Sequence, residues 1–394
     1  MPTRPLLRSC HARPLALALL LASVVAVPAA SADADPLVWW TDGEQQLLGR
    51  TPSGGMPNGV ASEPTFSHDS RNNRWIAFTS TATNIDGPVA AGRRNVYLVQ
   101  RGGTIKPWAN PWQYGSTRLL TVGRGGAPAN GDSWGASISG FTGPKDKPEE
   151  ARIVAFVSTA TNLVRGAGDG RTPRAYVANV RGGGMRLVRA PGWVTGVEVS
   201  ADAQRVFVTT TRGLYVETRR RIRKIASGSG MAHPATTTRG YQVAFERRGN
   251  LYLTTVASRS TVLLGPGTDP DVDAGEPNGP RRGFVRALTF TRDGGSFRMS
   301  FSGSRTKIEQ FGVTQTASKV NSGGSTTAFG EGRQVRLQVR LLDGGDYGGY
   351  VRPQGVCPLG QGDVTSVAVS TRYNYTAFTC QGGGLFGFYV GPYE

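Results

Sequence analysis

Residues 75–85 read WIAFTSTATNI, and residues 153–163 read IVAFVSTATNL. The two segments are identical at seven of eleven positions. Each joins an apolar, β-branched and aromatic run of strand length to a polar Ser-Thr-Ala-Thr-Asn sequence. Shorter relatives of the apolar run occur at residues 205–209, 241–245, 297–301 and 375–379. A unit that recurs along a chain indicates a repeat architecture.

The residues around these runs repeat as well. The segments that precede them end in polar turns, for which Ser, Asp and Gly are suited, at residues 66–70, 199–203, 290–294 and 369–372. A third strand is predicted at residues 95–99, 174–178, 213–216, 250–253 and 384–388. A fourth is predicted at residues 117–120, 185–188, 222–225 and 261–264. The repeated unit is therefore an antiparallel sheet of four strands.

Repeated four-stranded sheets are typical of β-propellers, in which no blade can bury both of its faces alone and the blades stack around a channel. The predicted second strands centre near Phe78, Phe156, Phe207, Phe245, Phe301 and Phe378. The sequence thus predicts an all-β fold, a single β-propeller of six four-stranded blades. Two long gaps, of 78 and 77 residues, leave seven blades as the alternative.

The two ends of the chain complement one another. Residues 37–51 read LVWWTDGEQQLLGRT, which we interpret as third and fourth strands without a first and second. The last repeat has three strands and then stops at Glu394. We expect the N-terminal strands to complete the C-terminal blade, which would remove an open sheet edge.

The STATN sequences at residues 80–84 and 158–162, each after an apolar strand, resemble the repeats of TolB-like propellers. These WD-like repeats are common in exported bacterial proteins. The resemblance covers most of the chain after residue 34 and is weak over residues 307–355. It implies a propeller fold, and in the TolB family the propeller binds protein partners in the envelope. We find no counterpart of that family's helical domain, so its pathway role is not transferred.

Residues 1–34 have the layout of a signal peptide: early arginines, the apolar stretch 15–27, and small residues with A-x-A frames. The apolar stretch is too short to cross a bilayer of about 30 Å as a helix. We expect cleavage after Ala32 or Ala34, leaving a propeller domain at residues 35–394. The predicted location is secreted, periplasmic or associated with the cell wall, without a later transmembrane segment.

The chain carries a formal net charge of +18. Outside the cell such a charge favours wall polymers, lipid head groups or acidic proteins as partners, and nucleic acid is not expected after export. Cys357 and Cys380 are the cysteines that follow the predicted leader, and we expect them to form a disulfide in an oxidising compartment. Closure of that loop would contribute about 3 kcal/mol.

Candidate catalytic residues are scarce. After the leader only His68 and His233 remain, and their places beside predicted first strands favour solvated turn or cap residues. The one G-x-S-x-G match, at residues 131–135, leads into a predicted first strand and lacks the strand-to-helix turn of a nucleophile elbow, and no phosphate-cradling loop is present. We therefore expect no catalytic residue and no cofactor. The alternative is a propeller enzyme, resembling a glycosidase, lyase or lactonase, whose acids and histidines would converge at the channel mouth.

Three aspartates, Asp269, Asp271 and Asp273, stand at alternate positions, and calcium prefers several such oxygen ligands. Pro270 and Val272 depart from the known calcium-loop pattern, however. A solvated loop between blades is the favoured interpretation, and the three aspartates are kept as a weak calcium candidate.

Asparagines recur in loops that should share one face of the propeller: Asn58, Asn84, Asn130, Asn162 and Asn278. Asparagine tolerates left-handed turns, so a structural role accounts for them, and a polar rim that binds sugar or peptide is the alternative. An insertion with Trp108, Trp112 and Tyr114 should leave from the opposite face. These aromatic residues could stack on a sugar ring, anchor a partner or pack on their own blade.

The densest basic run, where a third strand turns into a fourth, comprises Arg219, Arg220, Arg221, Arg223 and Lys224. A solvated hairpin tip and a docking site for an anionic polymer are the two interpretations. The sequence as a whole favours a monomeric, non-enzymatic binding or scaffold propeller. Its expected partner is an envelope protein, or a cell-wall glycan or anionic polymer.

Overall fold

The computed structural model describes residues 39–40, 43–68, 74–102, 113–140, 151–273, 284–302, 305–312, 319–320, 326–339, 350–370 and 375–389. The chain divides into two units, Met1–Pro36 and Leu37–Glu394, and the second holds all of the described residues. The regular structure of this described part is β, apart from one 3₁₀ turn at Arg124–Gly126 (η1). Within it, no helix has the length and apolar character needed to cross a membrane.

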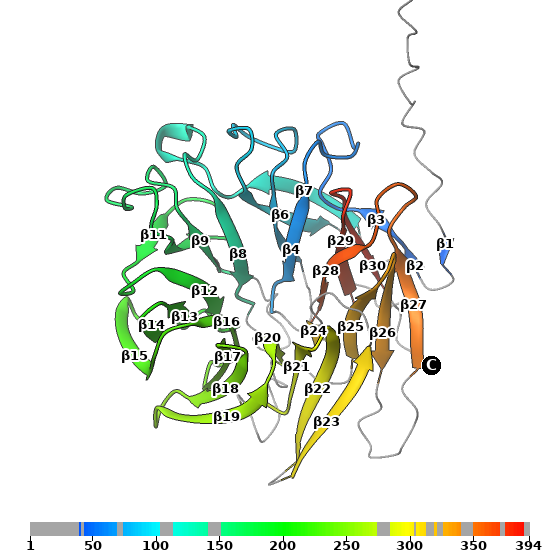
Figure 1. Cartoon of the computed structure of the whole chain (residues 1–394). Coiled ribbons are helices and arrows are strands. Elements are labelled where there is room, and N and C mark those ends of the chain that lie inside the picture. Colours follow the sequence, from blue (N-terminus) through cyan, green and yellow to red (C-terminus); the bar gives the residue numbers. More distant parts are fainter. Residues whose placement is uncertain are drawn as a thin grey trace, which may run out of the picture. The chain divides into compact units, whose positions relative to one another are not determined.

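Seven four-stranded antiparallel sheets are arranged around one centre (Figure 1). Blade 1 consists of β4 (Ala61–Phe66), β5 (Trp75–Ser80), β6 (Asn95–Gly102) and β7 (Gln113–Leu119). Blade 2 consists of β8 (Ser133–Ile138), β9 (Ile153–Ser158), β10 (Arg174–Asn179) and β11 (Met185–Val188). Blade 3 consists of β12 (Val194–Val199), β13 (Arg205–Thr210), β14 (Gly213–Thr218) and β15 (Arg221–Ser227).

The remaining blades repeat this order from the innermost first strand outward. Blade 4 consists of β16 (Met231–Thr236), β17 (Gln242–Arg247), β18 (Asn250–Thr255) and β19 (Ser260–Pro266). Blade 5 consists of β20 (Thr268–Val272), β21 (Ala287–Arg292), β22 (Gly295–Ser302) and β23 (Arg305–Gly312). Blade 6 consists of β24 (Lys319–Val320), β25 (Thr326–Glu331), β26 (Gln334–Val339) and β27 (Tyr350–Val356). Blade 7 consists of β28 (Val364–Val369), β29 (Tyr375–Cys380), β30 (Leu385–Tyr389) and β3 (Gln46–Leu47).

One buried phenylalanine occupies the second strand of every blade: Phe78, Phe156, Phe207, Phe245, Phe290, Phe329 and Phe378. In five blades it stacks on the aromatic residue directly opposite on the third strand, with ring centroids 5.4 to 5.6 Å apart. Such cross-strand aromatic pairs stabilise a sheet beyond the area that they bury. The repeated phenylalanine explains why similar short segments fold into similar blades.

The predicted number of six blades is wrong, because the structure has seven. The missed unit is blade 6, whose second strand β25 carries Phe329. This blade lacks the STATN sequence, and Arg336 rather than an aromatic residue faces Phe329 on the third strand. Its local signal is the dipeptide Ala328-Phe329, which also occurs as Ala-Phe in the second strands of blades 1, 2, 4 and 7.

The strands predicted for blade 5 are shifted by one position in the strand order. Residues 297–301, interpreted as a second strand around Phe301, lie in the third strand β22. The second strand is β21, and Asp293 and Gly294 turn it into β22 with positive φ angles of 49° and 73°. Two successive residues with positive φ favour a tight hairpin. The Asp-Gly turn therefore joins the second and third strands here, not the first and second.

The predicted closure of the ring is confirmed for one strand. β3 near the N-terminus pairs with β30 as the fourth strand of blade 7. The prediction that the N-terminal segment also supplies a third strand is wrong, because the third strand of blade 7 is β30. Within the described sheets, β1 (Trp39–Trp40) and β2 (Gly43–Glu44) pair only with one another.

Two side-chain contacts lie at this closure. The buried Gln45 side chain donates from Nε2 to the carbonyl of Val356, at 2.9 Å, and accepts the Val356 N–H at 3.0 Å. It thereby ties the closing segment to the outer strand of blade 6. The predicted disulfide is present and joins Cys357, which follows β27 of blade 6, to Cys380 at the end of β29 in blade 7.

Replacing Gln45 with alanine should weaken the closure, because both backbone groups of Val356 lose their side-chain partner. We expect the free energy of unfolding to fall by about 2 kcal/mol, measured by urea denaturation. The matched control is Gln204→Ala at an exposed turn, which should change stability by less than about 0.5 kcal/mol. Equal effects of the two variants would show that Gln45 does not hold the closure.

Candidate functional site at the channel

The first strands of the seven blades surround a cavity of about 530 Å³ at the centre of the ring. Every blade contributes lining residues, from Glu63 in β4 to Val369 in β28. The charged or titratable lining residues are Glu63, His68, Arg94, Glu198, His233, Asp269, Asp271 and Lys319.

Three of these side chains enter the cavity from the same position of a repeated β-bulge. In β4, β16 and β20 the pairing with the second strand slips, and the slipped segment contains Glu63, His233 or Asp269. Each has a positive φ, of 52°, 45° and 53° respectively, and each is followed by proline. Residues other than glycine rarely adopt a positive φ, and backbone strain of this kind is typical of functional sites. Bulges also redirect side chains, here toward the channel.

His233 forms the centre of a charged contact between blades 4 and 5. Its Nδ1 lies 3.0 Å from Oε2 of Glu246 in β17 and 3.9 Å from Oδ1 of Asp269 in β20. The hydrogen bond to Glu246 raises the pKa of His233, and Asp269 adds to the effect, against the opposing influence of desolvation and of Lys319. The same hydrogen bond lowers the pKa of Glu246. The pair is therefore favoured as imidazolium and carboxylate.

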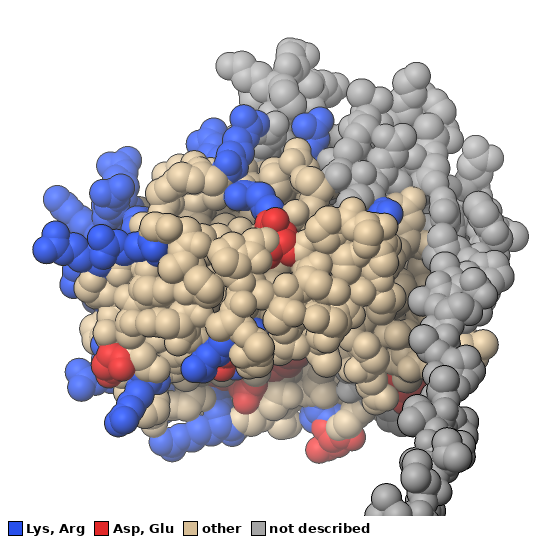
Figure 2. Space-filling model, turned by 90° about the horizontal axis from the view of Figure 1, so that it is seen from above, with Lys and Arg blue, Asp and Glu red and all other residues tan. Residues whose placement is uncertain are grey.

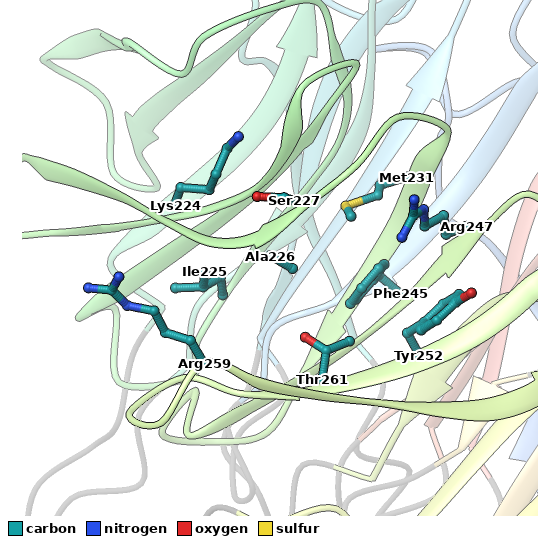
Figure 3. Close-up of a pocket in the computed structure, with 10 residues that line it drawn as sticks. All are labelled: Lys224, Ile225, Ala226, Ser227, Met231, Phe245, Arg247, Tyr252, Arg259 and Thr261. Atoms are coloured by element: carbon teal, nitrogen blue, oxygen red, sulfur yellow. The ribbon is translucent and has the colours of Figure 1, made fainter.

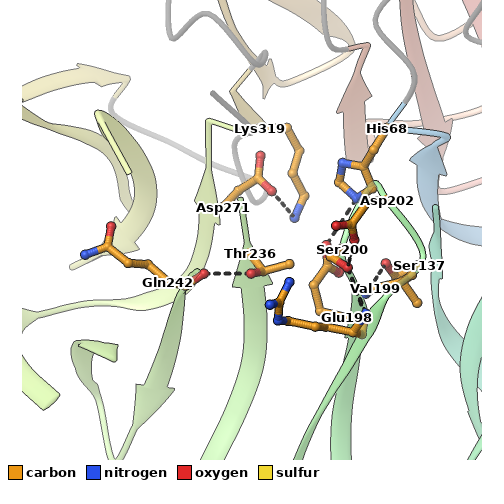
Figure 4. Close-up of polar contacts among 11 residues, drawn as sticks. His68, Ser137, Glu198, Val199, Ser200, Asp202, Thr236, Gln242, Asp271 and Lys319 are labelled. Atoms are coloured by element: carbon orange, nitrogen blue, oxygen red, sulfur yellow. Dashed lines mark hydrogen bonds and ion pairs between the residues drawn. The ribbon is translucent and has the colours of Figure 1, made fainter. Parts of the chain in front are cut away.

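His68 forms a second pair across the ring. It follows β4 of blade 1, and its Nε2 lies 3.1 Å from Oε1 of Glu198 in β12 of blade 3 (Figure 4). The side chains of His68 and Glu198 are 22% and 15% exposed. The interpretation as solvated turn or cap residues holds only in part: His68 lies in a bend but is 22% exposed, whereas His233 is 53% exposed but lies within β16. Both line the channel and both contact a carboxylate.

Glu63 connects blades 1 and 2. Its Oε2 accepts a hydrogen bond from the Thr79 hydroxyl at 3.1 Å and from the N–H of Gly135 in β8 at 2.8 Å. Glu246 makes the equivalent contact between blades 4 and 5, where it accepts the N–H of Asp269 at 3.3 Å. In both places a carboxylate binds the bulge residue of the following blade, which fixes the lining residues in place.

Lys319 of β24 lies among the acids of the channel. Its Nζ is 3.9 Å from Oδ1 of Asp271, and Figure 4 shows the two side chains facing one another. Desolvation opposes its charge, but Asp271 and, more weakly, three further lining carboxylates outweigh it and raise the pKa of Lys319. These acids belong to blades 1, 3 and 5. Lys319 therefore shares one electrostatic environment with side chains from across the cavity.

The cavity is acidic although the protein is basic. Four lining carboxylates face two permanent cations, Arg94 and Lys319, and the imidazolium form of His233, in a chain of net charge +18. On the side of the molecule seen in Figure 2, by contrast, Lys and Arg predominate over Asp and Glu. The channel therefore offers a ligand the opposite electrostatic environment from that outer surface.

The weak calcium candidate lies on a strand and not in a solvated loop. Asp269 and Asp271 belong to β20 and face His233 and Lys319. Asp273 is fully buried, accepts the N–H groups of Arg286 and Ala287 at 2.9 and 3.2 Å, and has its pKa raised to about 6 by desolvation. Within the described residues, no group of three His, Cys, Asp or Glu side chains is placed to hold a metal ion.

The predicted asparagine rim consists of paired loops. The Asn58 N–H donates to Oδ1 of Asn84 at 3.0 Å, and the Asn130 N–H donates to Oδ1 of Asn162 at 3.1 Å. In each pair the first asparagine also exchanges two hydrogen bonds with the threonine before the second. These contacts confirm that the loops share one face and give the asparagines a structural role. Asn278 lies outside the described residues.

The structure describes only some residues of the predicted aromatic loop, and it describes the whole basic run. Trp108 and Trp112 lie outside the described residues, while Tyr114 lies in β7 opposite Arg101. The basic run is the exposed hairpin between β14 and β15, with Arg219 and Arg220 in its turn at positive φ. Its predicted place at the outer edge of a blade is confirmed, whereas its docking role stays a prediction.

The channel site was missed in the sequence, although a signal was present. Residues 62–66, 232–236 and 268–272 read SEPTF, AHPAT and TDPDV. Each holds a titratable residue directly before proline at the same place in a first strand. Proline inside a strand indicates an edge or a bulge, and a bulge beside a channel redirects a side chain.

No family model matches the sequence, and none of the curated proteins matches it. Many solved structures do match. One is the β-propeller domain of Cps50 (Swd1) from Myceliophteria thermophila, with a TM-score of 0.52 and 11% sequence identity. The match covers 85% of this chain and 99% of that domain. At such low identity the likeness concerns the fold alone, which is the β-propeller.

Proposed function

We propose that this chain is a binding propeller whose channel holds a basic segment of a partner protein. The observation that carries the proposal is the acidic cavity of about 530 Å³ lined by all seven blades. A cavity of this size accommodates several side chains of a ligand. Charge complementarity favours a lysine or arginine side chain of the partner, since both donate charge-assisted hydrogen bonds to carboxylates.

The lining carboxylates are preorganised for such a ligand. Glu63, Glu198 and Asp271 each have a partner within the protein, so their positions do not depend on the ligand. Preorganisation of this kind reduces the entropy that binding costs. A cation that enters between the existing pairs would add contacts without rearranging the strands.

The location of the protein belongs to the same proposal. The leader-like residues 1–34 and the STATN repeats, which resemble those of TolB-like propellers, support export to the envelope or the extracellular space. We therefore place the partner among proteins of the envelope. A soluble scaffold role, without catalysis by this chain, is consistent with that location.

Selection of random peptides on the immobilised protein tests the binding site. We expect the selected peptides to be enriched in Lys and Arg relative to the starting library. The variant Glu198→Gln/Asp271→Asn should bind a selected peptide about tenfold more weakly, because it removes two carboxylates from the cavity. The control Asp169→Asn/Asp202→Asn removes two carboxylates that do not line the cavity and should leave the affinity unchanged. Peptides without basic enrichment, or equal effects of the two variants, would contradict the proposal.

Binding of the selected peptide should depend on pH through His233. His233 takes up a proton as the pH falls through its raised pKa, and the added positive charge should weaken the binding of a basic peptide. The protonated form also stabilises the fold below the ordinary pKa, and this stabilisation is lost as the pH rises through the raised pKa. His233→Asn should therefore flatten the affinity profile around the raised pKa of His233 and lower Tm mainly at the acidic end. A wild-type profile in the variant would exclude His233 as the titrating group.

A second candidate function is hydrolysis or lyase chemistry at the channel mouth. The pairs His68–Glu198 and His233–Glu246 favour it, because a carboxylate-oriented imidazole is a common general acid or base. Assays with glycoside, uronide and lactone substrates test it. Turnover that falls about a hundredfold or more in His68→Asn or His233→Asn would support the enzyme. Equal turnover in wild type and both variants would exclude these two histidines.

A further inference from the structure

A second concave site lies between the outer parts of blades 3 and 4, away from the channel. This cleft has a volume of about 480 Å³ (Figure 3). One wall is the outer strand β15 of blade 3, and the other is formed by blade 4. The lining residues are Lys224, Ile225, Ala226, Ser227, Met231, Phe245, Arg247, Tyr252, Arg259 and Thr261.

The charged residues of the cleft are all cations. Lys224, Arg247 and Arg259 line it, and no lining residue is an aspartate or glutamate. Over residues 218–268, which the structure describes throughout, the one acidic residue is Glu246. Its carboxylate contacts His233 and Asp269 at the channel. The positive charge of the cleft is therefore not neutralised by a local carboxylate, and a concave wall concentrates the resulting field.

Neighbouring groups hold the cleft in shape. Ile225, Met231 and Phe245 are buried and form its apolar floor. The guanidinium of Arg247 lies 6.0 Å from the ring centroid of Tyr252, and it also lies against the backbone of Gly228, where a Cβ would meet it at 2.6 Å. Substitution of Gly228 would displace this arginine. A guanidinium held in place loses less entropy when it binds an anion.

The cations continue beyond the cleft along one strand. β15 begins at the exposed hairpin with Arg219 and Arg220, and Arg221, Arg223 and Lys224 follow it toward the cleft. The side chain of Arg223 donates to the carbonyl of Val256 at 3.1 Å, which connects this row to blade 4. Cations arranged in a row match a linear ligand with repeated negative groups better than a single small anion.

We infer that the cleft and the adjoining strand β15 bind a linear phosphate polymer. Arginine donates paired hydrogen bonds to phosphate oxygens, and lysine adds a point charge. A concave site admits a flexible chain, whereas the flat surface of a bilayer cannot reach its floor. The ligand class is thus a polyanionic chain and not a membrane. This site is separate from the acidic channel and does not depend on the function proposed for it.

Titration of the full chain with labelled long-chain polyphosphate, followed by fluorescence anisotropy, tests the inference. We expect binding of the polymer and none of orthophosphate at the same phosphate concentration. The cleft variant Lys224→Gln/Arg247→Gln/Arg259→Gln should bind at least about tenfold more weakly, and the slope of log K against log salt should fall by about 2, as for the loss of three phosphate contacts. Its Tm should stay close to that of the wild type, since all three side chains lie at least partly at the surface.

A matched control separates the cleft from general charge. Arg93→Gln/Arg124→Gln/Arg165→Gln removes three exposed cations from blades 1 and 2 and should retain affinity within about twofold. Equal losses in the two triple variants would overturn the inference, and so would the absence of wild-type binding. Vesicles of anionic lipid form a third arm. Stronger binding to vesicles than to polyphosphate at equal phosphate concentration, lost in the cleft variant, would assign the site to a membrane and refute the polymer.

Discussion

A four-stranded sheet leaves two apolar faces open to water, and each blade of this propeller depends on its neighbours to cover them. The dependence includes the first and last blades, since Phe78 of blade 1 shares a buried cluster with Ala368 and Tyr375 of blade 7. The ring is held together on both sides of blade 7. There β3 pairs with β30, Gln45 binds Val356, and a disulfide joins blades 6 and 7. Without closure the end blades would each expose an apolar face.

The same stacking determines where charge can lie. Seven first strands converge on one centre, and bulges in three of them direct Glu63, His233 and Asp269 into a shared cavity. The blade faces are largely apolar, so most charged groups lie at the inner edge of the ring or at its outer surface, with Asp273 as a buried exception. In this protein the inner edge and the outer cleft carry charge of opposite sign. Acids predominate in the channel, while Lys224, Arg247 and Arg259 line a cleft between two outer edges without an acid.

Much of the fold could be predicted from the sequence because its determinants are local. The Ala-Phe runs, the polar turns and the short third strands recur as recognisable segments, and the unfinished last repeat indicated closure. Blade 6 was missed although it carries Ala328-Phe329, because its first strand β24 spans only two residues and Arg336 faces Phe329 on its third strand. The channel was missed for another reason. His68 and Glu198 are 130 residues apart, and no local pattern relates two residues that meet only after the ring has formed. Conversely, Asn58 and Asn84 were predicted to share a face because strand order alone fixes their loops.

The pairing of β3 with β30 also imposes an order on biosynthesis. Residues 46–47 are synthesised long before their partner at residues 385–389. Until then blades 1 to 6 can form only an open arc, and closing so long a loop carries an entropic cost that slows folding. A nascent chain that stalls before residue 385 would therefore be an attractive substrate for chaperones and proteases, because one side of blade 1 would still be uncovered.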